Sequence, residues 1–484
     1  MTGMISLRYR RGEMHEFRAA DSNFIYLVSA GAIFALDEVA HAALDRLSAG
    51  EMAHGELVGA LEAGGYARDD AEDLIRELRM VQGIISEEVV PAPAPMVTPP
   101  TDFPLQALVL NITNQCNLAC TYCYEFGADK IATPAGKKKY MSIETARASV
   151  DFLLEQSKGR RAVHITFFGG ETLMNFPLLR EVVGYANDRA AAQGRAITFS
   201  LTTNATLLTD EIIDFLSDNG VGVTVSMDGP AELQDSRRVY KSGKGSYAVI
   251  EPRLRKLIAR HRTRAITARV TLTDGVTDVI RIFRHLKDDL GFHEVGFAPV
   301  TASDDQAYSL NGDAMRDVLS QFHELADEWL EFALRGRMHG FSNVSETISE
   351  LIQGQNKSHP CGAGLGLLGV SPSGDLSPCH RFTDADTHSL GHIDSGIDHE
   401  KREDFLARGH VSAKFDCQTC WARPLCAGGC HHEAFVRYGD TGHANLHYCD
   451  WIRQWTDTCL KIYGAVSVLN PGFLERFAER KALS

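Results

Sequence analysis

The stretch NQCNLACTYCYEF at positions 114–126 follows directly after a strand-like apolar run, LQALVLNI, at 105–112. Its C-x3-C-x2-C spacing places three thiols, Cys116, Cys120 and Cys123, on one loop. A cubane iron–sulfur cluster needs four ligands, so three thiolates leave one iron open to a ligand that can receive an electron. A zinc knuckle is the alternative, but a closed zinc site requires a fourth ligand that this loop lacks.

Strands and helices alternate around this loop from about residue 104 to residue 310. Strand-like runs lie at 105–112, 162–168, 196–203, 221–227, 266–273 and 294–300. Helical patterns separate them at 142–157, 176–193, 209–219, 245–262 and 277–290. Such β/α units in series predict an α/β fold in which parallel strands, joined by right-handed crossovers, form a partial (β/α)6 TIM-like barrel. Ligands of such a barrel lie at the carboxyl ends of its strands, where the thiol loop begins.

The first 90 residues form a separate pattern. Strand-like sequence at 17–36 precedes helical patterns at 37–47, 56–63 and 69–80 and the β-like GII at 83–85. This content fits a winged-helix-like domain at 1–90. Five prolines between positions 91 and 100 then predict an extended linker at 91–103.

The remaining boundaries follow from changes in periodicity. We expect the barrel at 104–310, bridging helices at 311–358, a segment rich in Cys, His and Gly at 359–460, and a C-terminal helix or tail at 461–484. Because 359–460 shows little periodicity, metal binding more than apolar burial should hold it together.

Composition excludes several classes of protein. Lys and Arg number 49 and Asp and Glu 63, a net charge of −14 that disfavours a sequence-independent nucleic-acid binder. No apolar run approaches the ~20 residues needed to cross a bilayer, and no export signal precedes the chain, so we expect a cytoplasmic protein with no membrane partner. Eleven cysteines in such a chain indicate metal or redox chemistry.

These motifs resemble those of the radical S-adenosylmethionine (SAM) enzymes. After the thiol loop, the stretches FFGGET at 167–172, TTNATLL at 202–208, VSMDG at 225–229 and ARVTL at 268–272 follow in the family's order. In that family the open iron chelates the amino and carboxylate groups of SAM, and reduction cleaves SAM to methionine and a 5′-deoxyadenosyl radical. The resemblance therefore implies SAM and a 4Fe-4S cluster as cofactors.

The resemblance also implies which residues contact SAM. Glu171 would take the amino group and Arg269 the carboxylate, while the two polar residues of VSMDG would meet the ribose hydroxyls and Tyr122 the adenine. Taken singly, each could instead be a structural residue. Thr172 and Ala205 depart from the proline and glycine common in relatives. The full set of expected cofactor contacts is Tyr122, Gly169, Gly170, Glu171, Asn204, Ser226, Asp228 and Arg269.

A second cysteine constellation lies in the C-terminal segment, at Cys361, Cys379, Cys417, Cys420, Cys426, Cys430 and Cys449. It resembles the SPASM domain of peptide-modifying radical SAM enzymes, whereas a zinc ribbon would mimic a single CxxC pair. The resemblance implies two auxiliary 4Fe-4S clusters, and so three clusters in the chain. The outer cluster would use Cys417, Cys420, Cys426 and Cys449, and the inner cluster Cys361, Cys379 and Cys430.

Three assignments stay open at this point. Either Cys459 completes the inner cluster or one iron is open to a substrate thiolate, and Cys459 could also be a plain buried thiol. His380, His431 and His432 flank cluster cysteines and more often act as hydrogen-bond donors behind the ligands. Asp235 could serve as a catalytic base, with a helix-capping or salt-bridged aspartate as the alternative.

The N-terminal module resembles the precursor-recognition domain of peptide maturases, which adds a leader peptide as a strand to an exposed sheet edge. The same fold can bind DNA. The helical run EVAHAALDRL at 38–47 has one basic residue in ten, however, too few to face phosphates.

The whole chain is similar to the maturation proteins of quinohemoprotein amine dehydrogenases, through SLTTNATLL at 200–208, GFAPVT at 296–301 and LGLLGVSPSGDLSPCHRF at 365–382. This resemblance implies an enzyme that forms thioether bonds between cysteine sulfurs and methylene carbons of Asp or Glu in the dehydrogenase's small γ subunit. Its partners would be that Cys-rich polypeptide with its leader peptide, and an external electron donor such as flavodoxin or ferredoxin.

Two other functions remain as alternatives. One is a different SPASM peptide maturase, making thioethers or carbon–carbon links in a ribosomal peptide. The other is a non-catalytic iron–sulfur electron carrier. The CHRF at 379–382 differs from the Cys-Asp pair of sulfatase maturases, which argues against formylglycine formation.

Overall fold

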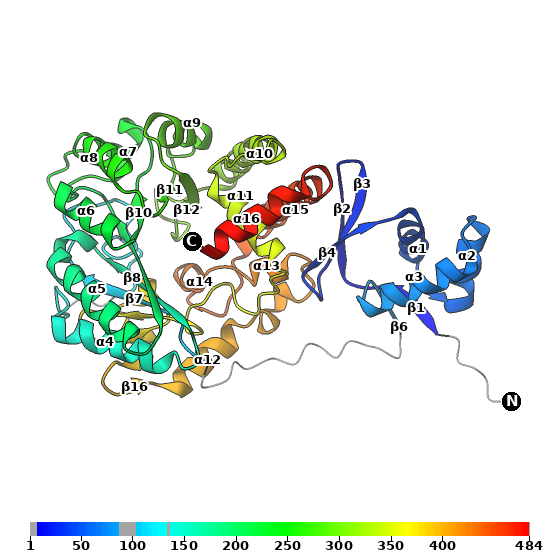
Figure 1. Ribbon diagram of the computed structural model, residues 1–484, viewed down its shortest axis with the longest axis horizontal. Coiled ribbons are helices and arrows are strands. Elements are labelled where there is room, and N and C mark those ends of the chain that lie inside the picture. Colours follow the sequence, from blue (N-terminus) through cyan, green and yellow to red (C-terminus); the bar gives the residue numbers. More distant parts are fainter. Residues whose placement is uncertain (1–6, 87–102, 133–135, 484) are drawn as a thin grey trace.

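The computed structural model describes residues 7–86, 103–132 and 136–483, with a small N-terminal module projecting from a larger body (Figure 1). The body consists of a β/α barrel and a cysteine-rich segment that lies between the barrel and the module. The predicted linker at 91–103 falls outside the described residues, apart from Phe103. No helix in the described ranges is both long and apolar enough to span a bilayer.

The N-terminal module contains two small antiparallel sheets and three helices. Their bounds are β1 (Arg8–Arg11), β2 (Met14–Ala19), β3 (Ser22–Leu27), β4 (Ala32–Leu36), α1 (Glu38–Ser48), β5 (Met52–Ala53), α2 (His54–Ala63), α3 (Arg68–Met80) and β6 (Ile84–Ser86). The strand orders are β2-β3-β4 and β5-β1-β6. The three helices pack their apolar sides into one core that belongs to the module itself. This core includes Tyr9, Leu44, Leu57 and Ile75. The predicted helices are present; β1 and β5 were not predicted.

The barrel contains the six predicted strands in parallel register. They are β7 (Ala107–Thr113), β8 (Ala162–Gly169), β9 (Ala196–Thr203), β10 (Gly222–Ser226), β11 (Ile266–Leu272) and β12 (Glu294–Pro299). The helices between them are α4 (Ile143–Gln156), α5 (Phe176–Ala191), α6 (Asp210–Asp218), α7 (Ala231–Arg237), α8 (Tyr247–Arg260) and α9 (Val279–Arg284), which continues as a π-helical turn at His285–Asp289. Figure 1 shows these helices along the outer face of the sheet.

The sheet has eight strands, not the six expected, because the cysteine-rich segment adds two. Strand β13 (Leu367–Val370) pairs in parallel with β7, and β14 (Leu376–Ser377) pairs antiparallel with β13. Backbone pairing therefore couples this segment directly to the strand that precedes the thiol loop.

Alternation along the strands separates an apolar outer face from a polar inner face. In β11, Ile266, Ala268, Val270 and Leu272 are buried against the helices, whereas the intervening Arg269 is exposed to the interior of the barrel. The half-buried side chains of the neighbouring strands are similarly polar. The interior is thus a polar space open to ligands, unlike a filled barrel core.

The two ends of the six-strand series meet at the barrel mouth. Tyr122, which follows β7, packs with Val300, Ala302 and Tyr308, which follow β12. Ser303 also donates a hydrogen bond to Asp129 across the same gap, with an Oγ to Oδ1 distance of 2.7 Å. Helices α10 (Gly312–Leu334) and α11 (Ser342–Ile352) then pack beside β12 and α15.

The cysteine-rich segment is more helical than its sequence suggested. It contains the short strands β15 (Gly391–His392) and β16 (Gly396–Ile397), followed by α12 (His399–Gly409), α13 (Arg423–Cys426) and α14 (His431–Tyr438). A long helix, α15 (Cys449–Leu469), begins at the last cysteine of the pattern and leads into α16 (Pro471–Leu483).

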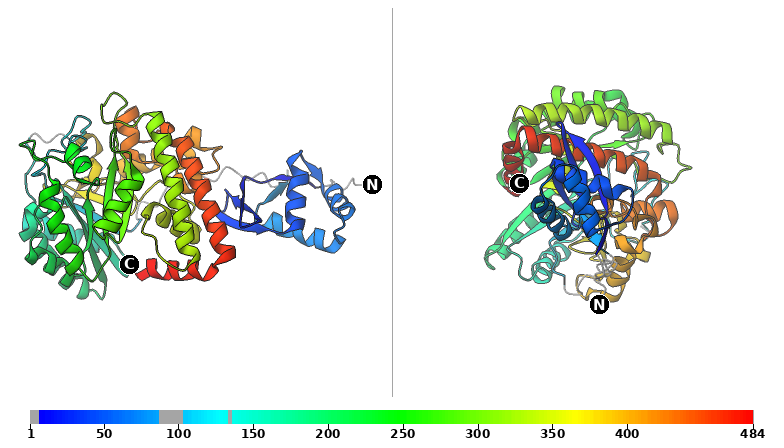
Figure 2. Two further views of the ribbon diagram at one scale, coloured as in Figure 1. Left: turned by 90° about the horizontal axis from the view of Figure 1, so that it is seen from above. Right: turned by 90° about the vertical axis from the view of Figure 1, so that its right-hand side faces the viewer.

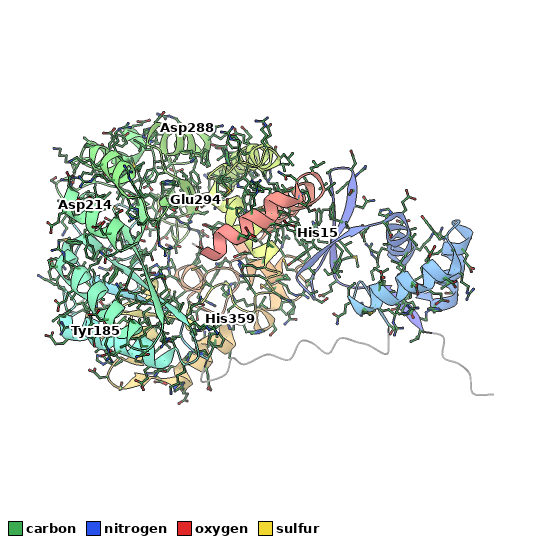
Figure 3. The ribbon with its side chains drawn as sticks, viewed as in Figure 1. His15, Tyr185, Asp214, Asp288, Glu294 and His359 are labelled. Atoms are coloured by element: carbon green, nitrogen blue, oxygen red, sulfur yellow. The ribbon has the colours of Figure 1, made fainter. Side chains whose placement is uncertain are left out.

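The N-terminal sheet docks on α15 (Figure 2). His15 of β2 hydrogen-bonds Asp457 at 2.7 Å and stacks on Trp421 with ring centroids 3.7 Å apart; Figure 3 labels it at this junction. Gly464 of α15 allows a close approach of the sheet, because an added Cβ would lie only 3.1 Å from both Ala19 and Phe17, a tight contact to which these neighbours would have to yield. The module is therefore seated on the cysteine-rich segment and not on the barrel.

Candidate active site

The thiol loop leaves the carboxyl end of β7 and is held by backbone hydrogen bonds from across the barrel mouth. The amides of Ala119 and Thr121 donate to the carbonyls of Val239 and Arg237, at 2.7 and 3.1 Å. The amide of Cys123 donates to the carbonyl of Cys120 at 3.2 Å. These contacts fix a compact loop that gathers its three thiols at the mouth.

Burial and neighbouring charges raise the pKa values of the thiols on this loop. Burial raises the pKa of Cys116 to about 12, with further increases from Glu171, Cys120 and Cys123. Burial likewise raises the pKa of Cys123 to about 11, and Glu125 and Cys120 add to it. Metal ligation requires deprotonated cysteine, so such mutually repelling thiols suit a cationic iron centre that compensates their charge.

The glycine pair after β8 permits two loops to touch. A Cβ on Gly169 would lie 2.2 Å from the carbonyl oxygen of Thr113, and one on Gly170 would lie 2.4 Å from that of Gln115. Gly169 also has a φ of 130°, which side chains rarely adopt. The close approach expected at these glycines is therefore made to the thiol loop's own backbone.

Glu171 is buried and hydrogen-bonded on both carboxylate oxygens. Oε1 accepts from the Leu173 amide at 3.0 Å and the Thr203 hydroxyl at 2.7 Å, and Oε2 accepts from the Asn204 amide at 2.7 Å. Burial raises the pKa of Glu171 despite these bonds. The carboxylate is thus rigidly oriented beside Cys116, whose pKa it raises.

Asn204 lies against the thiol loop. Its Nδ2 donates to Asn117 Oδ1 at 3.0 Å and lies 3.9 Å from the Cys116 sulfur. Ala205 has a φ of 61°, the left-handed conformation for which a glycine would be better suited. The glycine-to-alanine departure seen in the sequence thus falls on a strained position, while Thr172 simply hydrogen-bonds the Thr202 carbonyl at 2.8 Å.

Asp228 is hydrogen-bonded within the protein on both carboxylate oxygens. It is fully buried, and its Oδ2 accepts from Tyr122 at 2.6 Å and from Arg238 at 2.9 Å, while Oδ1 accepts from the Thr271 amide at 3.0 Å. The Arg238 guanidinium also lies 5.3 Å from the centre of the Tyr122 ring. Asp228 and Arg238 thus hold Tyr122 of the thiol loop in place, and the ribose contact expected at Asp228 stays a prediction.

Ser226 and Arg269 face the interior side by side. They are register partners of β10 and β11 near the carboxyl ends of these strands. Arg269 forms no ion pair within 4 Å among the described residues, although Glu346 raises its pKa against the lowering effect of burial. Both residues are available to a ligand bound above the thiol loop.

Three of the remaining cysteines, Cys361, Cys379 and Cys430, are those expected to form the inner set. Burial raises the pKa of both Cys361 and Cys379, that of Cys379 to about 12. Cys430 adds to the increase at both, and Cys361 adds to it at Cys379. Cys361 is an exposed residue.

A small cavity of about 190 Å³ is lined by five cysteines, Cys417, Cys420, Cys426, Cys430 and Cys449. Four of them are the cysteines expected to form the outer set, and Cys430, which is expected to belong to the inner set, lies against the same cavity. Residues 427–429 all have positive φ, at 47°, 83° and 82°, which makes a tight loop between Cys426 and Cys430.

A comparison with known families identifies the barrel. The family described as the Radical SAM superfamily matches residues 110–286, which run from β7 to the end of α9 and include the thiol loop. The chain contains a radical SAM domain. The protein is accordingly a radical SAM enzyme, a class that uses SAM together with a 4Fe-4S cluster.

Relatives of this radical SAM enzyme include a serine-type anaerobic sulfatase-maturating enzyme of Bacteroides thetaiotaomicron, 26% identical over 71% of this chain and 86% of the relative. A cysteine-type anaerobic sulfatase-maturating enzyme of Clostridium novyi is 23% identical over 72% of this chain and 94% of its own. An uncharacterized protein of Methanocaldococcus jannaschii is 35% identical, but that match spans 29% of this chain and less than half, 45%, of the relative.

Solved structures share the fold. The structure of anSMEcpe with bound AdoMet has a TM-score of 0.64 at 21% identity and covers 76% of this chain and 99% of its own. The structure of Streptococcus suis SuiB bound to precursor peptide SuiA has a TM-score of 0.50 at 12% identity and covers 91% of this chain and 99% of its own.

In this radical SAM enzyme, Asp235 and Cys459 both lie away from the thiol sets. Asp235 Oδ1 accepts from the amides of Ser246 and Tyr247, at 2.7 and 2.8 Å, and so caps the start of α8. Cys459 is fully buried in the apolar core, where Thr347 is its hydrogen-bonding neighbour. The geometry favours the capping alternative for Asp235 and the buried-thiol alternative for Cys459.

The three histidines beside the cysteines differ in their surroundings. His431 hydrogen-bonds the Thr441 carbonyl at 3.1 Å and packs on Phe405. The ring of His380 packs on the ring of Phe168, with the ring centroids 4.4 Å apart. His432 is fully buried, and neither ring nitrogen has a hydrogen-bond partner in the part of the chain that is described.

Three residues of the site were not singled out from the sequence. Tyr124 stands between the thiol loop and the inner set, with its ring 6.2 Å from His380. Arg381 lies over that ring, and Lys414 is buried between the inner and outer sets, where it donates to the Ala427 carbonyl at 3.2 Å. Only their nearness to cysteines in the sequence could have indicated a role.

The fit to iron–sulfur clusters rests on the thiols themselves. Among the described residues, no group of His, Cys, Asp and Glu is gathered closely enough to hold a single metal ion. What fits iron–sulfur clusters is the number of thiols, three of them on the loop after β7 and five around one small cavity.

Proposed function

We propose that this enzyme is a peptide maturase that forms thioether bonds between cysteine sulfurs and methylene carbons of Asp or Glu, with the small γ subunit of quinohemoprotein amine dehydrogenase as its substrate. The observation that carries the proposal is the inner set. Within the described residues it contains three thiols, Cys361, Cys379 and Cys430, while Cys459 is buried elsewhere. Three thiolates would leave a cluster with one position for a substrate thiolate.

The relatives support an action on proteins. Those named as sulfatase-maturating enzymes modify a protein, and SuiB was solved with a precursor peptide. The residue after Cys379 is His380, packed on Phe168, and not an acidic residue. This difference from the sulfatase maturases favours another modification over formylglycine formation.

The proposed roles of the chain's residues follow from their positions. Cys116, Cys120 and Cys123 would hold the cluster that binds SAM, and the inner and outer sets would hold auxiliary clusters. Glu171, Asn204, Ser226 and Arg269 would orient SAM. With these groups bound, the site supplies a primary carbon radical, an open iron and acceptors for one electron. Such a radical can take hydrogen from a methylene carbon whose C–H bond has no useful acidity.

The polar barrel interior would hold the substrate segment. In the net change, the peptide loses one hydrogen atom from carbon and one proton from the thiol, and the remaining electron passes to an acceptor in the protein. An external donor of the flavodoxin or ferredoxin type would supply the electron that starts each turnover. Asp228 and Arg238 keep Tyr122 fixed at the mouth during this chemistry.

The N-terminal module would bind the leader peptide. Strand β4 is an edge of the β2-β3-β4 sheet, and Phe34 on it is a partly exposed aromatic. β2, at the other edge, is engaged with α15. A leader strand added at β4 would thus find main-chain partners and an apolar side chain.

The decisive experiment is mass spectrometry of the γ polypeptide after anaerobic incubation with the iron-loaded enzyme, SAM and a reductant. We expect a loss of two hydrogens per bond, located by fragmentation to Cys with Asp or Glu. An unchanged polypeptide mass, from enzyme that does form 5′-deoxyadenosine, would refute this function. A non-catalytic electron carrier would form no 5′-deoxyadenosine, and a different peptide maturase would form it without altering the γ polypeptide.

A further inference from the structure

Two guanidinium groups, those of Arg269 and Arg381, share the barrel interior. Arg269 projects from β11, 3.3 Å from where a Cβ on Gly296 would lie. Arg381 reaches in from the cysteine-rich segment, and its Nη1 donates to Thr301 at 3.1 Å. Among the described residues, neither Arg269 nor Arg381 forms an ion pair within 4 Å, whereas Arg238 pairs with Asp228. Burial lowers the pKa of Arg269, Glu346 raises it, and Arg381 lowers it further. The two guanidinium groups therefore lie near enough to affect each other electrostatically.

An enclosed pair of like charges favours the binding of two anions. SAM contributes one carboxylate, and Arg269, beside Ser226 at the strand ends, is placed to take it. Arg381 then remains without a partner. Its fork of N–H donors suits a second carboxylate in planar, bidentate geometry, and one of its nitrogens is already anchored by Thr301.

The position of Arg381 indicates where that second carboxylate belongs. Its guanidinium carbon lies 4.8 Å above the centre of the Tyr124 ring, and Tyr124 directly follows Cys123 of the thiol loop. Arg381 is also only two residues from Cys379 in the sequence. Burial lowers the pKa of Arg381, whereas the inner thiols Cys430 and Cys379 raise it. Arg381 therefore bridges the gap between the SAM-binding end and the inner set.

We propose that Arg381 binds the side-chain carboxylate of the Asp or Glu that is cross-linked. This inference rests on the proposed function and adds the residue that selects the carbon. A carboxylate held by Arg381 would place the adjoining methylene group between the source of the radical and the inner set, where the thiol would bind. Specificity for acidic residues then arises from a charge-assisted contact and not from the reactivity of the C–H bond.

Glu433 adds to the increase in the pKa of Arg381 but forms no ion pair with it within 4 Å among the described residues. Glu433 Oε1 lies 3.1 Å from His447 Nε2 and 3.5 Å from Arg437 Nε, so this carboxylate already has other partners. A purely electrostatic role, in which Arg381 only tunes the inner cluster, is the competing explanation. That role predicts an altered reduction potential with no change in substrate selectivity.

The test measures binding without turnover. Iron-loaded, unreduced enzyme with SAM is titrated into a fluorescent, leader-free γ core polypeptide and into a version with the cross-linked Asp changed to Asn. We expect the wild type to bind the Asp form at least tenfold more tightly. Arg381→Gln should remove the preference for the Asp form and leave the affinity for the Asn form unchanged. Arg381→Lys should retain part of the preference.

Arg269→Gln is the matched control, since it should raise the SAM concentration needed for half-maximal 5′-deoxyadenosine without altering the Asp/Asn preference. Equal binding of the two polypeptides by the wild type would overturn the inference, whether or not the variants load iron. So would a preference that survives in Arg381→Gln. If the Asp polypeptide binds selectively but its mass does not change on reduction, the proposed function fails and the carboxylate site stands.

Discussion

At the scale of single residues, Asp228 shows what sequence reasoning could and could not reach. The motif VSMDG placed it correctly at the end of β10, beside the thiol loop. Its partner Arg238 lies ten positions away on a different element, and no local pattern reveals such a pairing. The sequence therefore indicated the position of Asp228 but not its buried ion pair with Arg238, and ribose binding by Asp228 stays a prediction.

Replacing Asp228 by Asn should lower the free energy of unfolding by about 3–5 kcal/mol, because the buried Arg238 would lose its counter-charge. Chemical denaturation of the apo-protein measures this loss. Asp214→Asn is the control, since that exposed carboxylate pairs with Arg260 at the surface and its loss should cost under about 1 kcal/mol. Equal losses for the two variants would contradict the structural role of Asp228.

Cys459→Ala should leave iron content unchanged, because the thiol is enclosed by apolar core and not by the inner set. Loss of its buried sulfur should cost about 1 kcal/mol of stability. Iron analysis and the spectrum of the reduced protein measure the first effect, with Cys430→Ala as the control expected to lose iron. Iron loss in Cys459→Ala would show that this thiol completes the inner cluster.

At the scale of elements, strands β7 to β12 and five of the helices between them lie within a few residues of their predicted bounds, because their hydrophobic periodicity is strong, whereas the short α7 was not predicted. Strands β13 and β14 were missed. The run LGLLGV at 365–370 is apolar but short, and only the edge of β7 to which it pairs makes it a strand. Likewise, the two-residue β5 exists through pairing with β1. Elements that depend on a distant partner leave little local signal.

The contact between α15 and the N-terminal sheet offers a test at this scale. Gly464→Leu should force the sheet away, since an added Cβ already lies 3.1 Å from Ala19 and Phe17, at a cost of about 1–3 kcal/mol. Small-angle scattering should show a larger radius of gyration. Gly184→Leu, on the exposed side of α5 with open space around it, is the matched control and should leave the radius unchanged. A compact Gly464→Leu protein would show that the docking tolerates the side chain.

At the scale of the whole molecule, the resemblance to SPASM enzymes implies a partition of ten cysteines into sets of three, three and four, and this partition stays a prediction. Only the first set lies on one short loop, because the inner set spans residues 361–430 and the outer set residues 417–449. The sequence singled out Arg269 through its motif but not Arg381, whose relation to Arg269 exists only after β11 and the cysteine-rich segment meet.

Anaerobically reconstituted protein should therefore contain about twelve irons per chain, and alanine substitution of all cysteines in any one set should remove about four. Iron and sulfide analysis measures the content, and electron paramagnetic resonance of the reduced variants separates the signals. A variant lacking Cys116, Cys120 and Cys123 should keep the other two signals but form no 5′-deoxyadenosine. Loss of every signal from a single substitution would show that the sets do not load independently.

Helix α15 begins at Cys449 of the outer set and, two to four turns on, carries Asp457 and Gly464 beneath β2. This helix thus joins a thiol at its first residue to the contact surface of the N-terminal module. We expect metal binding at the start of the helix to stabilise that contact as well. If the module binds a leader peptide as proposed, a chain starved of iron would hold the module loosely and leave the polypeptide to a copy able to process it.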